Sequence, residues 1–124
     1  MNIKEILNDF GKSLISKVRD GAYEDLLITI DGGFKSESTK KLSKDLSLFS
    51  PEQLEIVKKI VLSSIDDTLH HFLWKIEQSD KFDIVAKEQN ETFSLKEESD
   101  GLCGELYTQE GWIEQFSKYP ATQI

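Results

Sequence analysis

Apolar residues recur every three or four positions over two stretches of the chain, a spacing typical of amphipathic helices. The first stretch covers residues 3–19, and we expect it to stop at Asp20-Gly21, because glycine often follows the last turn of a helix. The second covers residues 51–78. Its apolar side chains step by three or four and predict the buried stripe of one long helix: Leu54, Val57, Val61, Ile65, Leu69, Phe72 and Ile76.

The start of the long helix carries its own signal. Ser50 stands at the N-cap position, Pro51 at the first helical position and Gln53 three residues after the cap. In this arrangement, a capping box, two side chains satisfy backbone N–H groups that the first turn leaves without partners. Proline fits there because it has no N–H to satisfy. The sequence therefore predicts that the helix begins at residue 51.

Two shorter segments lie between these stretches. "YEDLLITI" at residues 23–30 fits either a buried short helix or a strand, and we favour a helix because its neighbours are helical in pattern. The glycines of "DGG" at 31–33 predict a turn. Residues 38–46 then have the pattern of a short helix.

After residue 80 the pattern changes to alternation. "KFDIVAKE" and "ETFSLKE" alternate apolar and polar positions around a polar bend at Gln89-Asn90, which predicts a β-hairpin. We expect "LCGELYT" at 102–108 to be a third strand and "EGWIEQFSKY" at 110–119 to be a short helix.

Together these elements predict an α+β fold in a single domain spanning residues 1–124. Its N-terminal two-thirds, residues 1–79, are mainly helical and include one long helix. A small antiparallel β-meander and a short C-terminal helix follow over residues 80–119, and residues 120–124 form a tail.

Charge is distributed unevenly along the chain. The formal net charge is −8, which argues against a nucleic-acid partner, because phosphate contacts need clustered lysines and arginines. Residues 1–79 hold 13 acidic and 11 basic residues, a net charge of −2, whereas residues 80–124 hold 10 and 4, a net charge of −6. The C-terminal third therefore concentrates the negative field.

Several features that the sequence lacks indicate the compartment in which the protein acts. Cys103 has no second cysteine to pair with, which fits a reducing compartment. No apolar run approaches the roughly 18 residues that span a bilayer, and the first residues lack the pattern of a signal peptide. We expect a cytoplasmic protein without a membrane partner.

Both histidines lie in "SIDDTLHHFLW", residues 64–74. Asp66 with His70, and Asp67 with His71, are helical i,i+4 pairs that could each supply two metal ligands or an acid–base pair. The two histidines point in different directions, so further ligands would have to come from another segment. A metal-dependent or acid–base enzyme built on these four residues is our alternative hypothesis. We favour a packing helix with no catalytic residue, metal or cofactor.

The long helix has further apolar residues, Ile56, Ile60 and Trp74, on a second face. Either this face is covered by other elements of the same domain, or it meets a partner, which includes a second copy in a homodimer. We favour the first interpretation because the domain is small.

The segment "DGLCGELYTQEGWIEQFSKY" at 100–119, together with "LHHFLW" at 69–74, resembles small uncharacterised bacterial proteins with a "GEL…GWI..FSKY" ending. Such proteins are associated with immunity to toxins delivered between bacterial cells. The resemblance implies a bacterial cytosolic setting and supplies no chemical role for the motif residues.

The charge distribution and the resemblance favour an interaction protein that binds a protein partner, such as a basic toxin domain. Acidic side chains would steer the encounter and aromatic anchors would hold the complex. The predicted partner-binding residues are Glu97, Glu98, Asp100, Glu105, Tyr107, Glu110 and Trp112.

Overall fold

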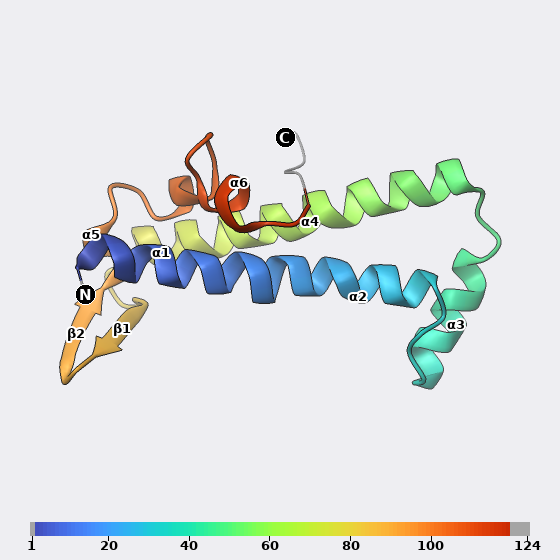
Figure 1. Cartoon of the computed structure of the whole chain (residues 1–124), viewed down its shortest axis with the longest axis horizontal. Helices are drawn as coiled ribbons and strands as arrows, with labels where there is room; N and C mark the ends of the chain where they lie inside the picture. The colour runs from blue at the N-terminus through green and yellow to red at the C-terminus, as the bar shows by residue number, and fades with distance from the viewer. Residues whose placement is uncertain (1, 120–124) are drawn as a thin grey trace.

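The structure, a computed structural model, describes residues 2–119 and is built on two long antiparallel helical arms (Figure 1). The first arm is continuous and comprises α1 (Ile3–Ser13), the π-helix η1 (Leu14–Arg19) and α2 (Asp20–Ile30). The second arm is α4 (Pro51–Gln78), and α3 (Glu37–Leu46) lies at the connection between the arms. The α+β class with one long helix is therefore as the sequence predicts.

The first arm passes through Asp20-Gly21 without a break, so the predicted stop there is wrong. Gly21 does not take the positive φ of a helix-ending glycine, which the structure shows instead at Gly32 (φ 78°) in the turn after α2. Residues 23–30 are helical, so the segment that fitted either a helix or a strand is a helix. Helices precede and follow it along the chain, which favours a helix here as well.

The middle of the first arm is a π-helix, in which the Asp20 N–H donates to the carbonyl of Ile15, five residues earlier. A π-helical turn accommodates an additional residue within the helix and is uncommon. Two consecutive charged residues, Arg19 and Asp20, are buried at this place. Their partners are described with the candidate site.

The capping box of α4 is confirmed. The Gln53 N–H donates to Ser50 Oγ at 3.1 Å, and the Ser50 N–H donates to Gln53 Oε1 at 2.8 Å. Both groups would otherwise lack partners in the first helical turn. The long helix therefore begins at Pro51, the residue that the sequence indicates.

The buried face of α4 is rotated from the predicted stripe. Phe72 is 49% exposed, and Val57, Val61 and Ile65 are only half-buried. Leu69 and Ile76 of the predicted stripe are buried as expected, and the other buried residues of α4 are Leu62, Asp66 and Leu73. The prediction placed only apolar residues on the buried face of α4, so it excluded Asp66. The pattern gives no sign of the buried cation that pairs with this carboxylate.

The second apolar face of α4 is not covered by the domain. Ile56, Ile60 and Trp74 are all exposed in the structure. The interpretation that other elements cover them is therefore wrong. The physical reason is that the C-terminal segment packs on the other side of the helix pair.

After α4 the chain forms the predicted hairpin. β1 (Val85–Glu88) and β2 (Glu91–Ser94) pair antiparallel, with Val85 opposite Ser94. Gln89 and Asn90 both have positive φ, 47° and 73°, as a two-residue hairpin turn requires.

The third predicted strand is wrong, so the sheet is a two-stranded hairpin. At the place of that strand the chain forms the 3-10 helix η2 (Cys103–Leu106), and α5 (Leu95–Glu98) replaces the end of the second predicted strand. Leu102 and Leu106, at the two ends of the 3-10 turn, are both fully buried. The predicted short C-terminal helix is confirmed as α6 (Trp112–Phe116). The predicted tail, residues 120–124, lies outside the described residues.

The C-terminal segment packs along the helix pair and closes the core (Figure 1). Trp112 contributes the largest fully buried side chain, with its ring edge-to-face with Phe10 at a centroid distance of 5.7 Å. The indole lies directly on Gly11, where an added Cβ would come 2.4 Å from Trp112 Cδ2. A glycine in the middle of α1 therefore makes room for the tryptophan.

We predict that Gly11→Ala lowers the free energy of unfolding by about 1–3 kcal/mol, because a methyl group there overpacks the core. Gly21→Ala in α2 is the matched control, since an added Cβ meets no atom within 4 Å there. It should raise the free energy of unfolding by about 0.5–1 kcal/mol through helix propensity. Urea denaturation of both variants tests this, and equal effects would contradict the packing of Trp112 on Gly11.

Candidate functional site

The polar centre of the fold is a buried ion-pair cluster around Arg19. Its guanidinium donates to Asp66 in two places, from Nε to Oδ1 at 2.5 Å and from Nη2 to Oδ2 at 3.2 Å. Nη1 donates to Asp20 Oδ1 at 3.0 Å and to Ser117 Oγ at 2.7 Å. The Lys118 N–H completes the cluster by donating to Asp20 Oδ2 at 2.9 Å. The first arm, α4 and the end of the C-terminal segment are thereby joined at one point.

This cluster changes the interpretation of the aspartate–histidine stretch. Asp66 is 1% exposed and is bound by Arg19, so it is part of the core and not of a surface pair. Asp67 and His71 do form the i,i+4 pair, with 3.5 Å between Nε2 and Oδ1, and both are largely exposed. His70 points elsewhere, and its Nδ1 lies 3.1 Å from the hydroxyl of Tyr107.

No group of three or more His, Cys, Asp or Glu side chains among residues 2–119 is arranged to hold a metal ion. Cys103 does not resemble an activated nucleophile either. Burial and the adjacent carboxylate of Glu77 raise the pKa of its thiol above the ordinary value. A raised pKa keeps the sulfur protonated, whereas reactive cysteines have lowered values.

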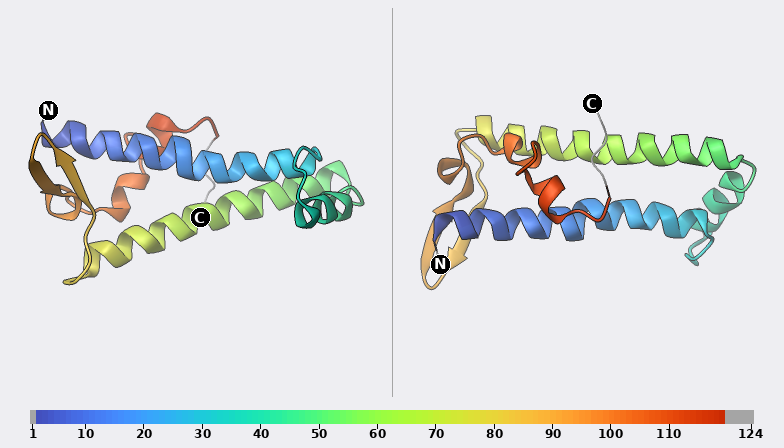
Figure 2. Two further views of the ribbon diagram at one scale, coloured as in Figure 1. Left: turned by 90° about the horizontal axis from the view of Figure 1, so that it is seen from below. Right: turned by 45° about the horizontal axis from the view of Figure 1, so that its top comes forward.

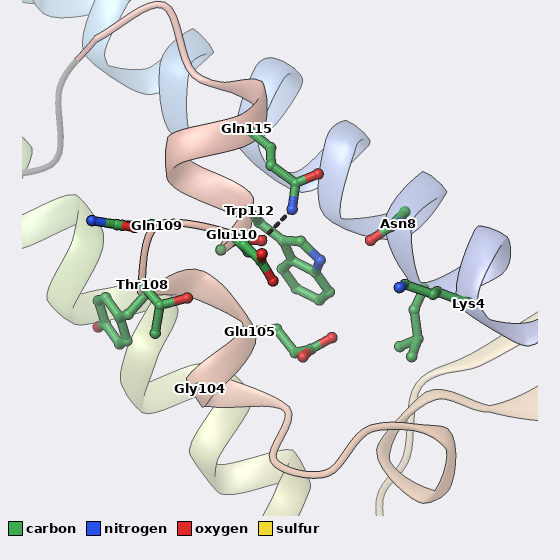
Figure 3. Close-up of a pocket in the computed structure, with 12 residues that line it drawn as sticks. Lys4, Asn8, Gly104, Glu105, Thr108, Gln109, Glu110, Trp112 and Gln115 are labelled. Carbon is green, nitrogen blue, oxygen red and sulfur yellow. Dashed lines mark hydrogen bonds between the residues drawn. The ribbon is translucent and has the colours of Figure 1, made fainter.

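A cleft of about 620 Å³ lies between α1 and the C-terminal segment, near several of the acidic residues. Figure 3 shows the side chains that surround it, with Lys4 and Asn8 coming from α1 and Glu105 facing them from η2. Trp112 closes the floor, and the loop before it adds Glu110. We call this hollow the acidic cleft and define it by Lys4, Asn8, Glu105, Glu110 and Gln115, which are its polar lining residues with side chains near its centre.

The loop that carries Glu110 is held in a fixed shape. Gly111 approaches the backbone of Tyr107 so closely that a Cβ would come 2.0 Å from the Tyr107 carbonyl oxygen. Thr108 takes a positive φ of 81°, and the Gly111 N–H donates to its carbonyl at 3.1 Å. The Gln115 side-chain amide donates to the Glu110 carbonyl oxygen (Figure 3). The cleft wall is therefore preorganised by backbone contacts.

Glu105 is the unusual carboxylate of the cleft. It is half-buried, and loss of solvent together with the negative charge of Asp100 raises its pKa above the ordinary value for a glutamate. Within residues 2–119, no Lys, Arg or His nitrogen lies within ion-pair distance of Glu105 or Glu110. Lys4 lies in the same cleft without forming an ion pair with either.

The structure brings together some of the predicted partner-binding residues and separates others. Glu105, Tyr107, Glu110 and Trp112 all line the acidic cleft, and Asp100 is close enough to act on Glu105 electrostatically. Glu97 and Glu98 are exposed on α5 and do not line the cleft.

Trp112 is only 2% exposed, so it is an anchor of this fold and is not available as an anchor for a partner. The reason is that its indole packs against Phe10 and Gly11. This contact between residues far apart in the chain cannot be recognised from the sequence alone. Tyr107 is half-buried, and its hydroxyl is engaged with His70. Burial and three surrounding acidic groups, Asp66 first, then Cys103 and Asp67, raise the pKa of this hydroxyl.

Sequence reasoning missed Lys4, Asn8 and Gln115, which complete the cleft. Lys4 and Asn8 are i,i+4 neighbours on α1 and are about one hundred residues away from Glu105 along the chain. No local signal connects them. Arg19 was missed as well, although it has no acidic residue at i±4, where Ile15 and Tyr23 stand, and this absence was a signal that could have been used.

No protein-family model, curated protein or solved structure matches the chain. The resemblance of its C-terminal segment to bacterial immunity proteins therefore stays a prediction. Within residues 2–119, no helix combines the length and the apolar character needed to cross a bilayer.

We predict that Asp66→Asn lowers the free energy of unfolding by about 3 kcal/mol, because it leaves a buried guanidinium with one fewer carboxylate. Asp67→Asn is the matched control at the next position and should change stability by less than about 0.5 kcal/mol, since exposed pairs are screened by solvent. Thermal and urea denaturation measure both. Equal, small effects would contradict the burial of Asp66 against Arg19.

Proposed function

We propose that this chain is an interaction protein that takes up a basic side chain of a protein partner in the acidic cleft. The observation that carries the proposal is the state of Glu105. It is a half-buried carboxylate, next to Asp100 and Glu110, without an ion-pair partner among the described residues.

The electrostatics of the cleft favour a cationic ligand. Charging Glu105 is unfavourable in the free protein because solvent is partly removed and another negative charge is near. A lysine or arginine side chain in the cleft would offset both costs and form charge-assisted hydrogen bonds. Arginine suits a site with two carboxylates because its planar guanidinium can donate to both.

The rest of the C-terminal third supports the encounter. Its net charge of −6 attracts a basic protein from a distance, and this attraction raises the association rate more than the final affinity. Glu97 and Glu98 on α5 serve this steering role in the proposal, while Glu105 and Glu110 make the contact. The cleft wall is preorganised, so little conformational entropy is lost on binding.

The partner that best fits this chemistry is a basic protein domain, such as a toxin that an immunity protein neutralises. The resemblance of residues 100–119 to such proteins supports this class. The unpaired Cys103 supports a cytoplasmic site of action, where an unpaired thiol remains reduced.

The binding test titrates the labelled protein with an arginine-containing basic peptide. Binding is monitored through the amide NMR shifts of the protein. We predict shifts at residues 104–112 and a loss of affinity of about tenfold or more in Glu105→Gln/Glu110→Gln, equivalent to about 1.4 kcal/mol. Glu52→Gln/Glu55→Gln is the matched control, since it removes two exposed charges at the far end of α4. It should weaken binding less than about twofold.

Two results would contradict the proposal. One is an equal loss of affinity in both double variants, which would mean that the peptide responds to net charge alone. The other is a set of shifts outside the cleft. Capture of a basic protein from the native host that dissociates as salt rises would extend the result to the natural partner.

The raised pKa of Glu105 also predicts a pH-dependent effect on stability. A carboxyl group with a raised folded-state pKa binds its proton more tightly in the folded state, so its contribution falls as pH rises through the interval between the unfolded and folded values. Glu105→Gln should therefore be more stable than the natural protein at neutral pH. The difference should shrink as pH falls below the ordinary range of glutamate.

The groups facing Glu105 in this test are Lys4 from α1, Glu110 from the loop before α6, and Asp100. Glu110→Gln is the comparison variant, because this carboxylate of the same cleft is exposed and its substitution should not reproduce the full pH dependence. Thermal melting across pH measures both. A natural protein that is more stable than Glu105→Gln at neutral pH would show that Glu105 is stabilising, contrary to the proposal.

A further inference from the structure

The side of the helix pair opposite the C-terminal segment has an apolar groove of about 370 Å³ between η1, α2 and α4. Seen from below in Figure 2 (left), the C-terminal segment lies behind the helix pair, so it does not cover this side. The described residues that line the groove are all uncharged: Val18, Ala22, Ile60, Val61, Ser64, Ile65, Thr68 and Leu69. We call this surface the open face.

The open face is the exposed part of the apolar stripe of α4. Because the buried face of α4 is rotated toward Asp66 and Leu73, the other edge of the stripe is left half-exposed along Val61 and Ile65. Ile60 is 60% exposed and Val18 is 52% exposed at the two sides of the groove. The fold thus buries only part of the apolar stripe of α4.

We propose that the open face is the interface of a homodimer, in which the helix pairs of two copies pack into a four-helix arrangement. Four-helix bundles bury such stripes by placing helices around a common core. One helix pair with a covering segment on one side supplies half of that architecture. A second copy supplies the other half.

The open face offers both projecting and recessed residues to a second copy. Exposed Ile60 and Val18 project beside a hollow whose lining includes the small residues Ala22, Ser64 and Thr68. A two-fold axis would set the projecting side chains of one copy into the hollow of the other, as an isologous interface requires. A single chain therefore carries both halves of the contact.

Charge also favours a second copy at this place. Two chains with a net charge of −8 repel each other, most strongly where the C-terminal thirds meet. The described residues of the groove lining carry no charge, so a second copy can approach there without placing like charges in contact.

The apolar area around the open face is comparable with the area that a stable dimer buries. From Leu54 to Phe72, α4 extends over about 27 Å, and two helices side by side are about 20 Å wide, which gives a footprint of roughly 500 Å² before the relief of side chains is counted. Stable dimers bury about 600–1,000 Å² per copy. The apolar stripe from Leu54 to Phe72, which contains the open face, therefore approaches what a dimer needs.

Light scattering during size-exclusion chromatography tests the proposal with the full chain. We expect twice the chain mass of 14.2 kDa at concentrations near 100 μM, with dissociation on dilution. Ile60→Glu should shift the protein to the monomer mass, because it places a carboxylate in the contact on both copies. Trp74→Glu is the matched control, since Trp74 is also exposed on α4 but does not line the groove, and it should leave the dimer intact.

Circular dichroism of both variants shows whether the helices remain folded. A monomer mass for the natural protein over the whole concentration range would overturn the proposal. A dimer that persists in Ile60→Glu and is lost in Trp74→Glu would overturn the assignment to the open face. Because the acidic cleft lies on the other side, glutamine variants of Glu105 and Glu110 should not change the mass, so this result is independent of the proposed function.

Discussion

The burial of Arg19 with two aspartates is the interaction on which the rest of the structure depends. Its guanidinium lies where a π-helical turn brings Arg19 and Asp20 into the core, and it joins α4 through Asp66 and the C-terminal segment through Ser117. Buried ions are tolerated only when partners replace the lost water. No buried side-chain nitrogen or oxygen among the described residues lacks a hydrogen-bond partner, so this condition is met.

Both proposed binding surfaces follow from this constraint. Asp66 turns one side of α4 inward, and the apolar residues on the other edge of the stripe are left on the open face. The same cluster fixes the end of the C-terminal segment, which lays Trp112 on Gly11 and forms the floor of the acidic cleft. The two sides of the helix pair thus differ in chemistry: one has unpaired carboxylates and the other has uncharged side chains.

Much of the fold could be predicted from local sequence, because its signals are local. The capping box at Ser50, the hairpin turn at Gln89-Asn90 and the helical pattern of α4 each depend on residues close together in the chain. The 3-10 turn η2, where a third strand was expected, was not predictable, since the spacing of Leu102 and Leu106 fits a strand as well as a turn. The rotation of α4 and the cleft depend on contacts between distant residues, such as Arg19 with Asp66 and Lys4 with the loop of Glu110. Charge alone selected Glu105 and Glu110 together with Glu97 and Glu98, which do not line the cleft, and the burial of Trp112 was not predictable.

The central claim is that Glu105 is a carboxylate held ready for a cation. The most direct measurement is the carboxyl-carbon NMR titration of Glu105 in the free protein and with an excess of an arginine-containing peptide. The account predicts a raised pKa in the free protein that falls when the peptide binds, because a cation favours the charged form. An ordinary pKa in the free protein, or a raised pKa that the peptide leaves unchanged, would contradict it.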